Sequence, residues 1–310
     1  MTYEADEVLS VELVHPDGKP LPDWTPGAHI DLHTGGQVRQ YSLCGDPADT
    51  TRYRIAVLRA PASRGGSEFV HRELRPGATV TVRGPRNHFP LTDADAYVFI
   101  AGGIGVTPLL AQAREAGARG SGWQFWYGGR GRSSMAFADE LTALAGLTPG
   151  KASVVLHPKD ERGGRMDLAR ILAQVPDGAR VYCCGPQSLI DAVEAARTES
   201  GLGDRLHVER FAGTPAAPED GERGFEVECA RSGRTVAVGP DESIVDALED
   251  AGVYVEASCR DGVCGTCETR VIAGTPDHRD TLLSSAQHAA GDVMMLCVSR
   301  CADKRLVLDI

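Results

Sequence analysis

The stretch Ser258–Glu268, "SCRDGVCGTCE", decides the fold of the last part of this chain, because it places three cysteines close together. Cys259, Cys264 and Cys267 follow the spacing C-x4-C-x2-C. Five of the nine cysteines fall within the last 52 residues, and the other four are scattered. Such clustering favours metal binding over a disulfide framework.

With Cys297 the pattern becomes C-x4-C-x2-C-x29-C, which is the plant-type spacing for a [2Fe–2S] cluster held by four thiolates. Gly262 and Gly265 let the loop turn and let backbone N–H groups approach the sulfides. A structural zinc site and free cysteines are the alternatives, but zinc modules more often use paired C-x2-C units. Cys301 falls outside the pattern, and we interpret it as an ordinary small residue.

Composition excludes several classes of protein. The net charge of -11 over 310 residues argues against nucleic acid binding, which usually needs a basic face. An acidic protein more plausibly docks on a basic patch of a partner protein. The sequence has no apolar run as long as a membrane span and its first residues are acidic, so we expect a cytoplasmic protein without membrane contact.

The pattern along the chain predicts a multidomain protein. Short alternating segments indicate a β-sandwich or β-barrel over residues 1–92, and strands alternating with helices indicate an α/β domain with a parallel sheet over 93–212. Residues 213–223 are rich in Pro, Gly and charge and read as a linker. Residues 224–310 are expected to form an α+β β-grasp ferredoxin domain.

Two helix boundaries are specific enough to check. "MAFADELTALAG", residues 135–146, predicts a helix of the nucleotide domain. In the last domain, Asp241 or Ser243 is expected to cap a helix that starts at the apolar-periodic run following it. The nine histidines show no metal-ligand spacing, and we expect most of them to face solvent.

Three short motifs are candidates for cofactor binding. "RQYSL", residues 39–43, has the R-x-Y-[ST] form that flavin-binding barrels use, although an Arg and a Tyr on a strand are often simple surface packing. "SRGGS", residues 63–67, precedes a helix, where backbone N–H groups can hold a phosphate. "AGGIGVTP", residues 101–108, links a buried strand to a helix, the place for a pyrophosphate, but it lacks the full G-x-G-x-x-G pattern.

The order of these motifs, with "YCCGP" and "HVERF" after them and the ferredoxin pattern last, resembles the phthalate dioxygenase reductase family over nearly the whole chain. The resemblance implies that residues 1–92 form a β-barrel flavin domain and that 93–212 form an α/β parallel-sheet nucleotide domain. It also implies FMN, NADH as the usual hydride donor, and a terminal oxygenase as the electron acceptor. Two departures are visible. Gln40 stands where Thr is common, and the N-terminus is short by about one strand, so the first barrel strand is expected to be reduced or absent.

The resemblance also implies residue roles. FMN would be held by Arg39, Tyr41 and Ser42, by the backbone of Ala56, Val57 and Leu58, and through its phosphate by Gly65, Gly66 and Ser67. The nicotinamide dinucleotide would meet Gly103, Gly105 and Thr107. Cys184 would lie near the nicotinamide and Phe211 near the flavin ring, so Ser42, Cys184 and Phe211 are the candidate catalytic residues.

The choice of nucleotide donor depends on the loop after the second strand of the nucleotide domain. "YGGRGRSSMAF" puts Arg130, Arg132, Ser133 and Ser134 where the adenosine ribose should fall, with no acid before Asp139. Arginine there favours a 2′-phosphate, whereas a carboxylate favours the 2′-hydroxyl. We expect NADH as the donor and keep NADPH use as a hypothesis.

Three functions are compatible with these features. The first is a reductase that passes single electrons from flavin through [2Fe–2S] to a Rieske-type oxygenase. The second is the same electron chain serving a cytochrome P450, which the sequence does not separate from the first. The third is a ferredoxin-like sensor with a vestigial flavin site, which the intact Arg39, Ser42 and glycine-rich loops argue against.

Overall fold

The structure is a computed structural model that describes residues 1–60, 65–197, 200–213 and 223–310. Most of the predicted linker 213–223 and the beginning of "SRGGS" therefore lie outside the described residues. The chain divides into two compact units, Met1–Arg210 and Phe211–Ile310. The predicted flavin and nucleotide domains thus belong to one unit, and the predicted boundaries between domains stay predictions.

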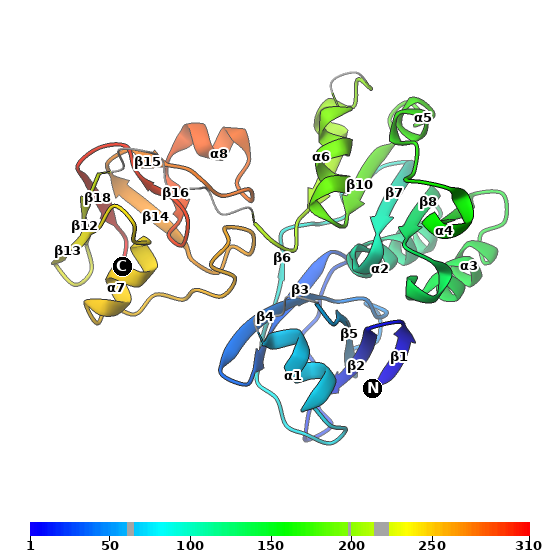
Figure 1. Cartoon of the computed structure of the whole chain (residues 1–310), viewed down its shortest axis with the longest axis horizontal. Helices are drawn as coiled ribbons and strands as arrows, with labels where there is room; N and C mark the ends of the chain where they lie inside the picture. Colours follow the sequence, from blue (N-terminus) through cyan, green and yellow to red (C-terminus); the bar gives the residue numbers. More distant parts are fainter. Residues whose placement is uncertain (61–64, 198–199, 214–222) are drawn as a thin grey trace. The chain divides into compact units, whose positions relative to one another are not determined.

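The first part of unit 1 consists of antiparallel strands in two three-stranded sheets, of order β1-β2-β5 and β4-β3-β6 (Figure 1). A bridge between Leu43 and Ile55 joins the two sheets. The first strand, expected to be reduced or absent, is present with four residues. The elements are β1 Thr2–Ala5, β2 Val8–Val14, β3 Ala28–Thr34, β4 Gln37–Ser42, β5 Arg52–Leu58, α1 Gly66–Arg72 and β6 Val82–Asn87.

The second part of unit 1 is a parallel five-stranded sheet of order β11-β10-β7-β8-β9 with helices on both faces (Figure 1). The strands are β7 Ala96–Gly102, β8 Gly122–Gly129, β9 Ala152–Pro158, β10 Arg180–Cys184 and β11 Leu206–Glu209. The α-helices are α2 Val106–Ala118, α3 Ala138–Gly146, α4 Lys159–Arg162, α5 Leu168–Ala173 and α6 Gln187–Ala195. The 3-10 turns are η1 Gly103–Gly105, η2 Arg132–Ser134 and η3 Gly203–Arg205.

Successive side chains of β7 point to opposite faces of the parallel sheet and are apolar on both, which explains why helices cover both faces of the sheet. Val98 and Ile100 pack in the core that includes Ile190 of α6, whereas Phe99 packs in the core that includes Leu109 of α2. A strand buried on both faces is what a parallel sheet requires. The α2 side of this core continues into barrel residues, and therefore the two parts of unit 1 share one hydrophobic core. The barrel residues in it are Val8, Cys44, Ala56, Phe89 and Leu91.

The predicted start of α3 is wrong by three residues. The helix begins at Ala138 rather than at Met135, because Phe137 takes a left-handed φ of 60° at the N-cap position. Met135, Ala136 and Phe137 are buried instead in the shared core of unit 1.

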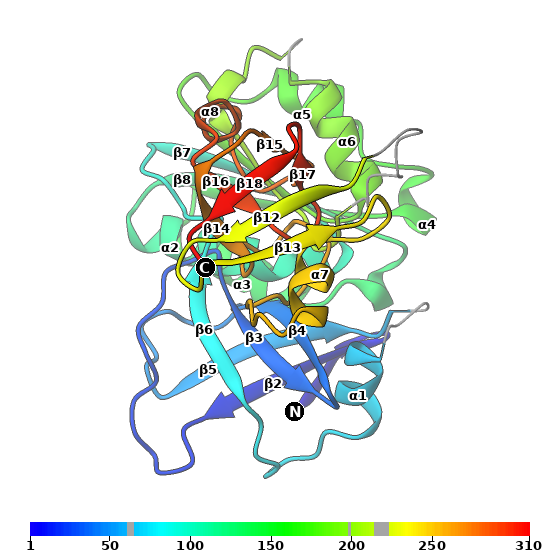
Figure 2. The ribbon, with the colours of Figure 1, turned by 90° about the vertical axis from the view of Figure 1, so that its left-hand side faces the viewer.

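Unit 2 is a five-stranded mixed sheet of order β13-β12-β18-β14-β16 with a helix against it (Figure 2). Strands β12 and β18 are parallel, which is the arrangement that places the C-terminal strand at the centre of the sheet. Ser243 caps α7, where its Oγ accepts a hydrogen bond of 3.1 Å from the N–H of Asp246, so the predicted cap is confirmed. The elements are β12 Phe225–Cys229, β13 Arg234–Val238, α7 Ile244–Asp250, β14 Glu268–Ala273, β15 Pro276–Asp277, α8 Ser285–Ala290, β16 Val293–Met295, β17 Arg300–Cys301 and β18 Arg305–Leu308.

Candidate functional site

The four cysteines of the C-x4-C-x2-C-x29-C pattern come together in unit 2. Cys267 ends the loop just before β14, and Cys297 follows β16, the antiparallel neighbour of β14. The N–H of Leu296 donates to the carbonyl of Cys267 at 3.4 Å, which fixes these two segments side by side. Cys264, Cys267 and Cys297 are buried, and Cys259 is half-buried.

The sulfurs form a chain of contacts, in which Cys259 neighbours Cys264 and Cys297, and Cys297 also neighbours Cys267. Contacts with the Cys264 and Cys297 thiols lower the pKa of Cys259, and a contact with Cys297 lowers the pKa of Cys267. The N–H of Asp261 donates to the Cys259 sulfur at 3.3 Å, which also favours a thiolate. Four converging sulfurs with backbone donors are the ligand set that [2Fe–2S] requires, so the residues fit the cluster.

Glycine is required at one position of this loop. Gly262 has a φ of +69°, and a Cβ on it would lie 2.6 Å from a methyl carbon of Val298, the residue after Cys297. The bare glycine therefore lets the two cysteine-bearing segments approach each other. Cys301 lies on β17, opposite Pro276.

The predicted flavin residues meet in the barrel. Arg39, Tyr41 and Ser42 lie on β4, and burial raises the pKa of Tyr41 to about 12. A Cβ on Gly66 would lie 2.5 Å from Cγ of Arg39, so the start of α1 lies against the Arg39 stem only because residue 66 is glycine. This cradle joins a guanidinium to the N-terminal turn of α1, a combination suited to a phosphate.

The other predicted flavin residues border this cradle. The Leu43–Ile55 bridge sets the end of β4 beside β5, which carries Ala56, Val57 and Leu58. The carbonyl of Val57 lies 2.9 Å from Nε2 of His71 on α1, which ties the helix to the strand. Gly65 has a φ of +104°, and the Ser67 hydroxyl accepts from the N–H of Ala60 at 3.2 Å. Figure 1 shows α1 beside β4.

The two glycine turns of the nucleotide domain touch each other. The turn after β7 and the turn after β10 sit at the same edge of the sheet, since Ala101 pairs with Cys184. A Cβ on Gly105 would lie 2.2 Å from the carbonyl oxygen of Cys184, and one on Gly102 would lie 2.7 Å from Cδ of Pro186. The carboxyl edge of a parallel sheet is where such folds bind ligands, and these turns form its floor.

Gly103 and Thr107 differ in what they offer a ligand. Gly103 has a φ of +53° and open space where a side chain would be. Thr107 is buried, and its hydroxyl donates to the carbonyl of Ile104 at 2.9 Å. The Thr107 side chain thus closes its own turn, which leaves the N–H groups at the start of α2 as the groups suited to an anion.

Cys184 has an acidic neighbour that the sequence reasoning missed. Parallel pairing of β10 and β11 sets Glu209 opposite Cys184, with Oε2 3.9 Å from Sγ. Burial raises the pKa of Glu209 to about 8 and raises the pKa of the Cys184 thiol. Glu209 can therefore hold a proton near neutral pH at the nucleotide edge. Its place in "HVERF", at the end of a strand, was the available signal.

The loop after β8 places Arg130 and Arg132 on the surface. Arg132 Nε lies 2.8 Å from Glu161 Oε1, an acid from a later turn of the chain. Phe211, the remaining candidate, belongs to unit 2 and is 44% exposed. A cavity of about 520 Å³ lined by Asp95, Ser121 and Arg180 opens at the amino-terminal edge of the sheet, opposite the nucleotide turns.

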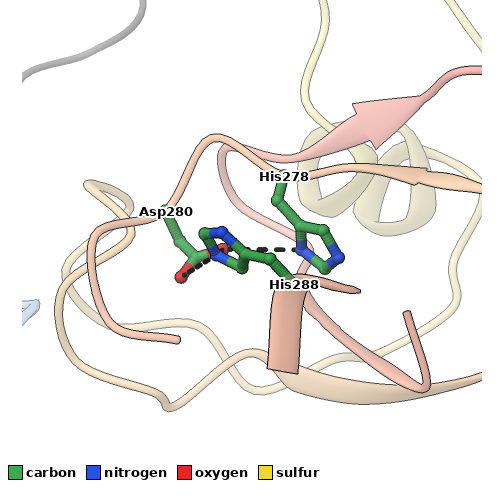
Figure 3. Close-up of side chains that lie close together, drawn as sticks. All are labelled: His278, Asp280 and His288. Carbon is green, nitrogen blue, oxygen red and sulfur yellow. Dashed lines mark hydrogen bonds and ion pairs between the residues drawn. The ribbon is translucent and has the colours of Figure 1, made fainter. Parts of the chain in front are cut away.

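The expectation that most histidines face solvent is wrong. Only His88 of the nine is exposed. Two of the histidines, His278 and His288, form a cluster with Asp280 in unit 2 (Figure 3). Nε2 of His288 lies 3.3 Å from Oδ1 of the buried Asp280, and the His278 ring stacks on the His288 ring with centroids 4.4 Å apart and planes 13° apart. A ring nitrogen binds a metal within the ring plane, so two stacked parallel rings in this orientation do not share one ion.

Comparisons with known proteins agree with this geometry. A family model for an oxidoreductase NAD-binding domain matches residues 99–195, and one for a 2Fe-2S iron-sulfur cluster binding domain matches residues 227–302. Phenoxybenzoate dioxygenase subunit beta of Ectopseudomonas oleovorans is 44% identical over 100% of this chain and 95% of that protein.

Two solved structures extend the likeness to the fold. Phthalate dioxygenase reductase is 35% identical, with a TM-score of 0.69 over 99% of this chain and 95% of that one. An intact type IV self-sufficient cytochrome P450 monooxygenase is 44% identical, with a TM-score of 0.91 over 100% of this chain but only 40% of that one. Among the described residues, no helix is long and apolar enough to cross a membrane.

Proposed function

Because this chain belongs to the phthalate dioxygenase reductase family, we propose that it is the reductase component of an oxygenase system. It takes a hydride from NAD(P)H onto FMN and passes single electrons through [2Fe–2S] to a terminal oxygenase. The observation that carries the proposal is the pair of sites on one chain: two contacting glycine turns over a parallel sheet, and four converging cysteine sulfurs.

Bound flavin supplies the conversion of a two-electron hydride into single electrons, and the protein positions the groups that take part. Arg39 with Gly65, Gly66 and Ser67 would bind the FMN phosphate. Tyr41 and the backbone of residues 56–58 would line the ring. FMN is favoured over FAD because this cradle ends at a phosphate site, where FAD would have to continue into AMP.

At the nucleotide edge, the N–H groups around Gly103 and Gly105 would bind the pyrophosphate. Cys184 would lie against the nicotinamide, and Ser42 would lie against the flavin ring. Glu209 holds a proton beside Cys184, because burial favours its neutral form. A neutral acid there keeps an unpaired negative charge away from the point of hydride transfer.

In unit 2, Cys259, Cys264, Cys267 and Cys297 would ligate the cluster as thiolates. Such a cluster needs reduced cysteines, which fits a cytoplasmic protein. The partner is a Rieske-type oxygenase in the leading form of the proposal. A cytochrome P450 is the second candidate, favoured by the likeness of this chain to 40% of a self-sufficient cytochrome P450 monooxygenase.

Two measurements on the purified chain test the proposal. Heat release of the flavin followed by chromatography should give FMN, and FAD would contradict that assignment. Anaerobic stopped-flow with NADH should show bleaching near the flavin band followed by bleaching of cluster absorbance. If cluster absorbance is present but no flavin is retained and neither NADH nor NADPH reduces the cluster, the vestigial-sensor function is correct instead.

A further inference from the structure

A carboxylate from a distant part of the chain lies against the loop expected to receive the adenosine ribose. Strands β8 and β9 are parallel neighbours, with Gly129 opposite Pro158, so the segments that follow them leave the sheet at the same edge. The N–H of Asp160 donates to the carbonyl of Arg130 at 3.2 Å, which joins the two segments. Asp160 therefore lies next to the loop that carries Arg130, although the two residues are 30 positions apart in the sequence.

Gly131 shows how closely the carboxylate approaches. A Cβ on Gly131 would lie 2.5 Å from Oδ2 of Asp160. The φ of Gly131 is -155°, an extended conformation that any residue adopts. A side chain added at this position would therefore have to displace the Asp160 carboxylate, while the backbone conformation would tolerate it.

Two of the four residues expected to hold a 2′-phosphate, Arg132 and Ser133, are already engaged with acids. Arg132 Nε lies 2.8 Å and 3.2 Å from the two carboxylate oxygens of Glu161. The Ser133 hydroxyl donates to Asp6 at 2.5 Å, and its carbonyl accepts from the N–H of Asp6 at 2.7 Å. A 2′-phosphate arriving here would have to displace carboxylates that carry the same sign of charge.

The carboxylate of Asp160 is placed to accept hydrogen bonds from a ligand. It is exposed, and its Oδ1 accepts from the N–H of Glu161 at 2.9 Å. Within the described part of the chain, its Oδ2 accepts no hydrogen bond. Lys159 and Arg162 flank it on the same turn, so the position of the carboxylate, and not the net charge of the turn, would repel a 2′-phosphate.

We propose that Asp160 accepts hydrogen bonds from the adenosine ribose hydroxyls of NADH and thereby makes the enzyme select NADH over NADPH. This inference rests on the proposed function, since it assigns a specificity residue to the same nucleotide site. The general chemistry is that a carboxylate near the end of a strand binds the 2′-hydroxyl and repels a 2′-phosphate. Here the acid comes from the turn after β9, because the end of β8 carries only glycine and arginine.

The test measures kcat/KM for NADH and for NADPH in cytochrome c reduction by the flavin- and cluster-loaded full chain. Asp160→Asn should lower the NADH value at least about tenfold, the size of one hydrogen bond to a charged group, and leave or raise the NADPH value. Asp177→Asn makes the same change at an exposed position just before β10, at the opposite edge of the sheet, and should change the NADH to NADPH ratio less than about twofold. An unchanged ratio in Asp160→Asn, or the same shift in Asp177→Asn, overturns the proposal.

Two further measurements separate this inference from its premise. Inhibition by ADP and by 2′,5′-ADP reports the adenosine half alone, and Asp160→Asn should weaken ADP inhibition while sparing 2′,5′-ADP. Gly131→Ala, whose added carbon would displace the carboxylate, should weaken ADP inhibition as well. Preferential binding of 2′,5′-ADP by the parent chain would instead assign Arg130 and Arg132 to a 2′-phosphate. A parent chain that neither nucleotide reduces would contradict the proposed function itself.

Discussion

Arg54 on β5 and Glu140 on α3 form a two-pronged ion pair that joins the barrel to the nucleotide domain within unit 1. Nη2 lies 2.7 Å from Oε1, and Nη1 lies 3.0 Å from Oε2. Arg54 also donates to the carbonyl of Cys44 at 2.7 Å and lies 5.0 Å from the centre of the Phe137 ring. Glu140 forms a second ion pair with Arg114 of α2, whose Nη2 lies 2.6 Å from Oε1. One carboxylate therefore neutralises two guanidinium groups at the junction of the two folds.

We expect Glu140→Ala to destabilise unit 1 by about 2 kcal/mol, because it leaves two half-buried cations facing each other without an anion. Thermal unfolding of the full chain, followed by release of flavin fluorescence, measures the change. Glu115→Ala removes an acid that pairs with Arg119 four residues later on a more exposed face of α2, and should cost about 0.5 kcal/mol or less. Equal losses in the two variants would contradict a role for Glu140 at the junction.

The fourth cluster ligand can be tested with a pair of cysteines only four residues apart. Cys297→Ser should abolish most of the cluster absorbance, because the Cys297 sulfur contacts both Cys259 and Cys267. Cys301→Ser should keep it, since Cys301 lies on β17 opposite Pro276. Absorbance and iron content of the purified variants decide the question. Loss of the cluster in both variants, or in Cys301→Ser alone, would show that the ligand set is assigned wrongly.

The contact between the two glycine turns predicts a steric effect at Gly105. Gly105→Ala would place a carbon 2.2 Å from the Cys184 carbonyl, so the turns must separate. We expect the KM for NADH to rise and the free energy of unfolding to fall by about 1–3 kcal/mol. Gly117→Ala on α2 is the control, because its Cβ would make only an ordinary 3.5 Å contact and alanine favours helix. A KM that stays the same in Gly105→Ala would show that this turn does not bind the nucleotide.

Much of the fold could be predicted because its signals are local. Apolar runs followed by helical periodicity indicate the parallel sheet, and the spacing of Cys259, Cys264 and Cys267 indicates the ferredoxin loop. The features that could not be predicted are contacts between residues far apart in the sequence. The approach of Asp160 to Gly131 and the pairing of Arg54 with Glu140, 86 residues apart, follow from how strands and helices are packed, which no short window of sequence contains. The burial of Glu209 has the same origin, since it follows from the pairing of β11 with β10.

Glu209 gives a prediction about pH. Burial raises its pKa from 4.5 to about 8 in the folded chain, while the unfolded chain keeps the ordinary value. Between pH 4.5 and about 8, the folded protein holds a proton that the unfolded chain releases. The folded state then binds more protons, so this group makes the free energy of unfolding fall as pH rises through that window. Above about pH 8 both states are ionised and the loss is complete.

Glu209→Gln removes this titration while keeping the size of the side chain. We expect the variant to gain stability relative to the parent as pH rises from 5 to 8, because only the parent loses a buried proton in this range. The gain should be about 1–2 kcal/mol in all, since Glu209 is half-buried and solvent screens part of the effect. Unfolding midpoints of the full chain at several pH values measure the gain, and the pH profile of NADH-driven cytochrome c reduction is a second readout. Glu73→Gln makes the same change at an exposed position and should track the parent at every pH. A constant offset between Glu209→Gln and the parent across this range would show that Glu209 is already ionised in the folded chain.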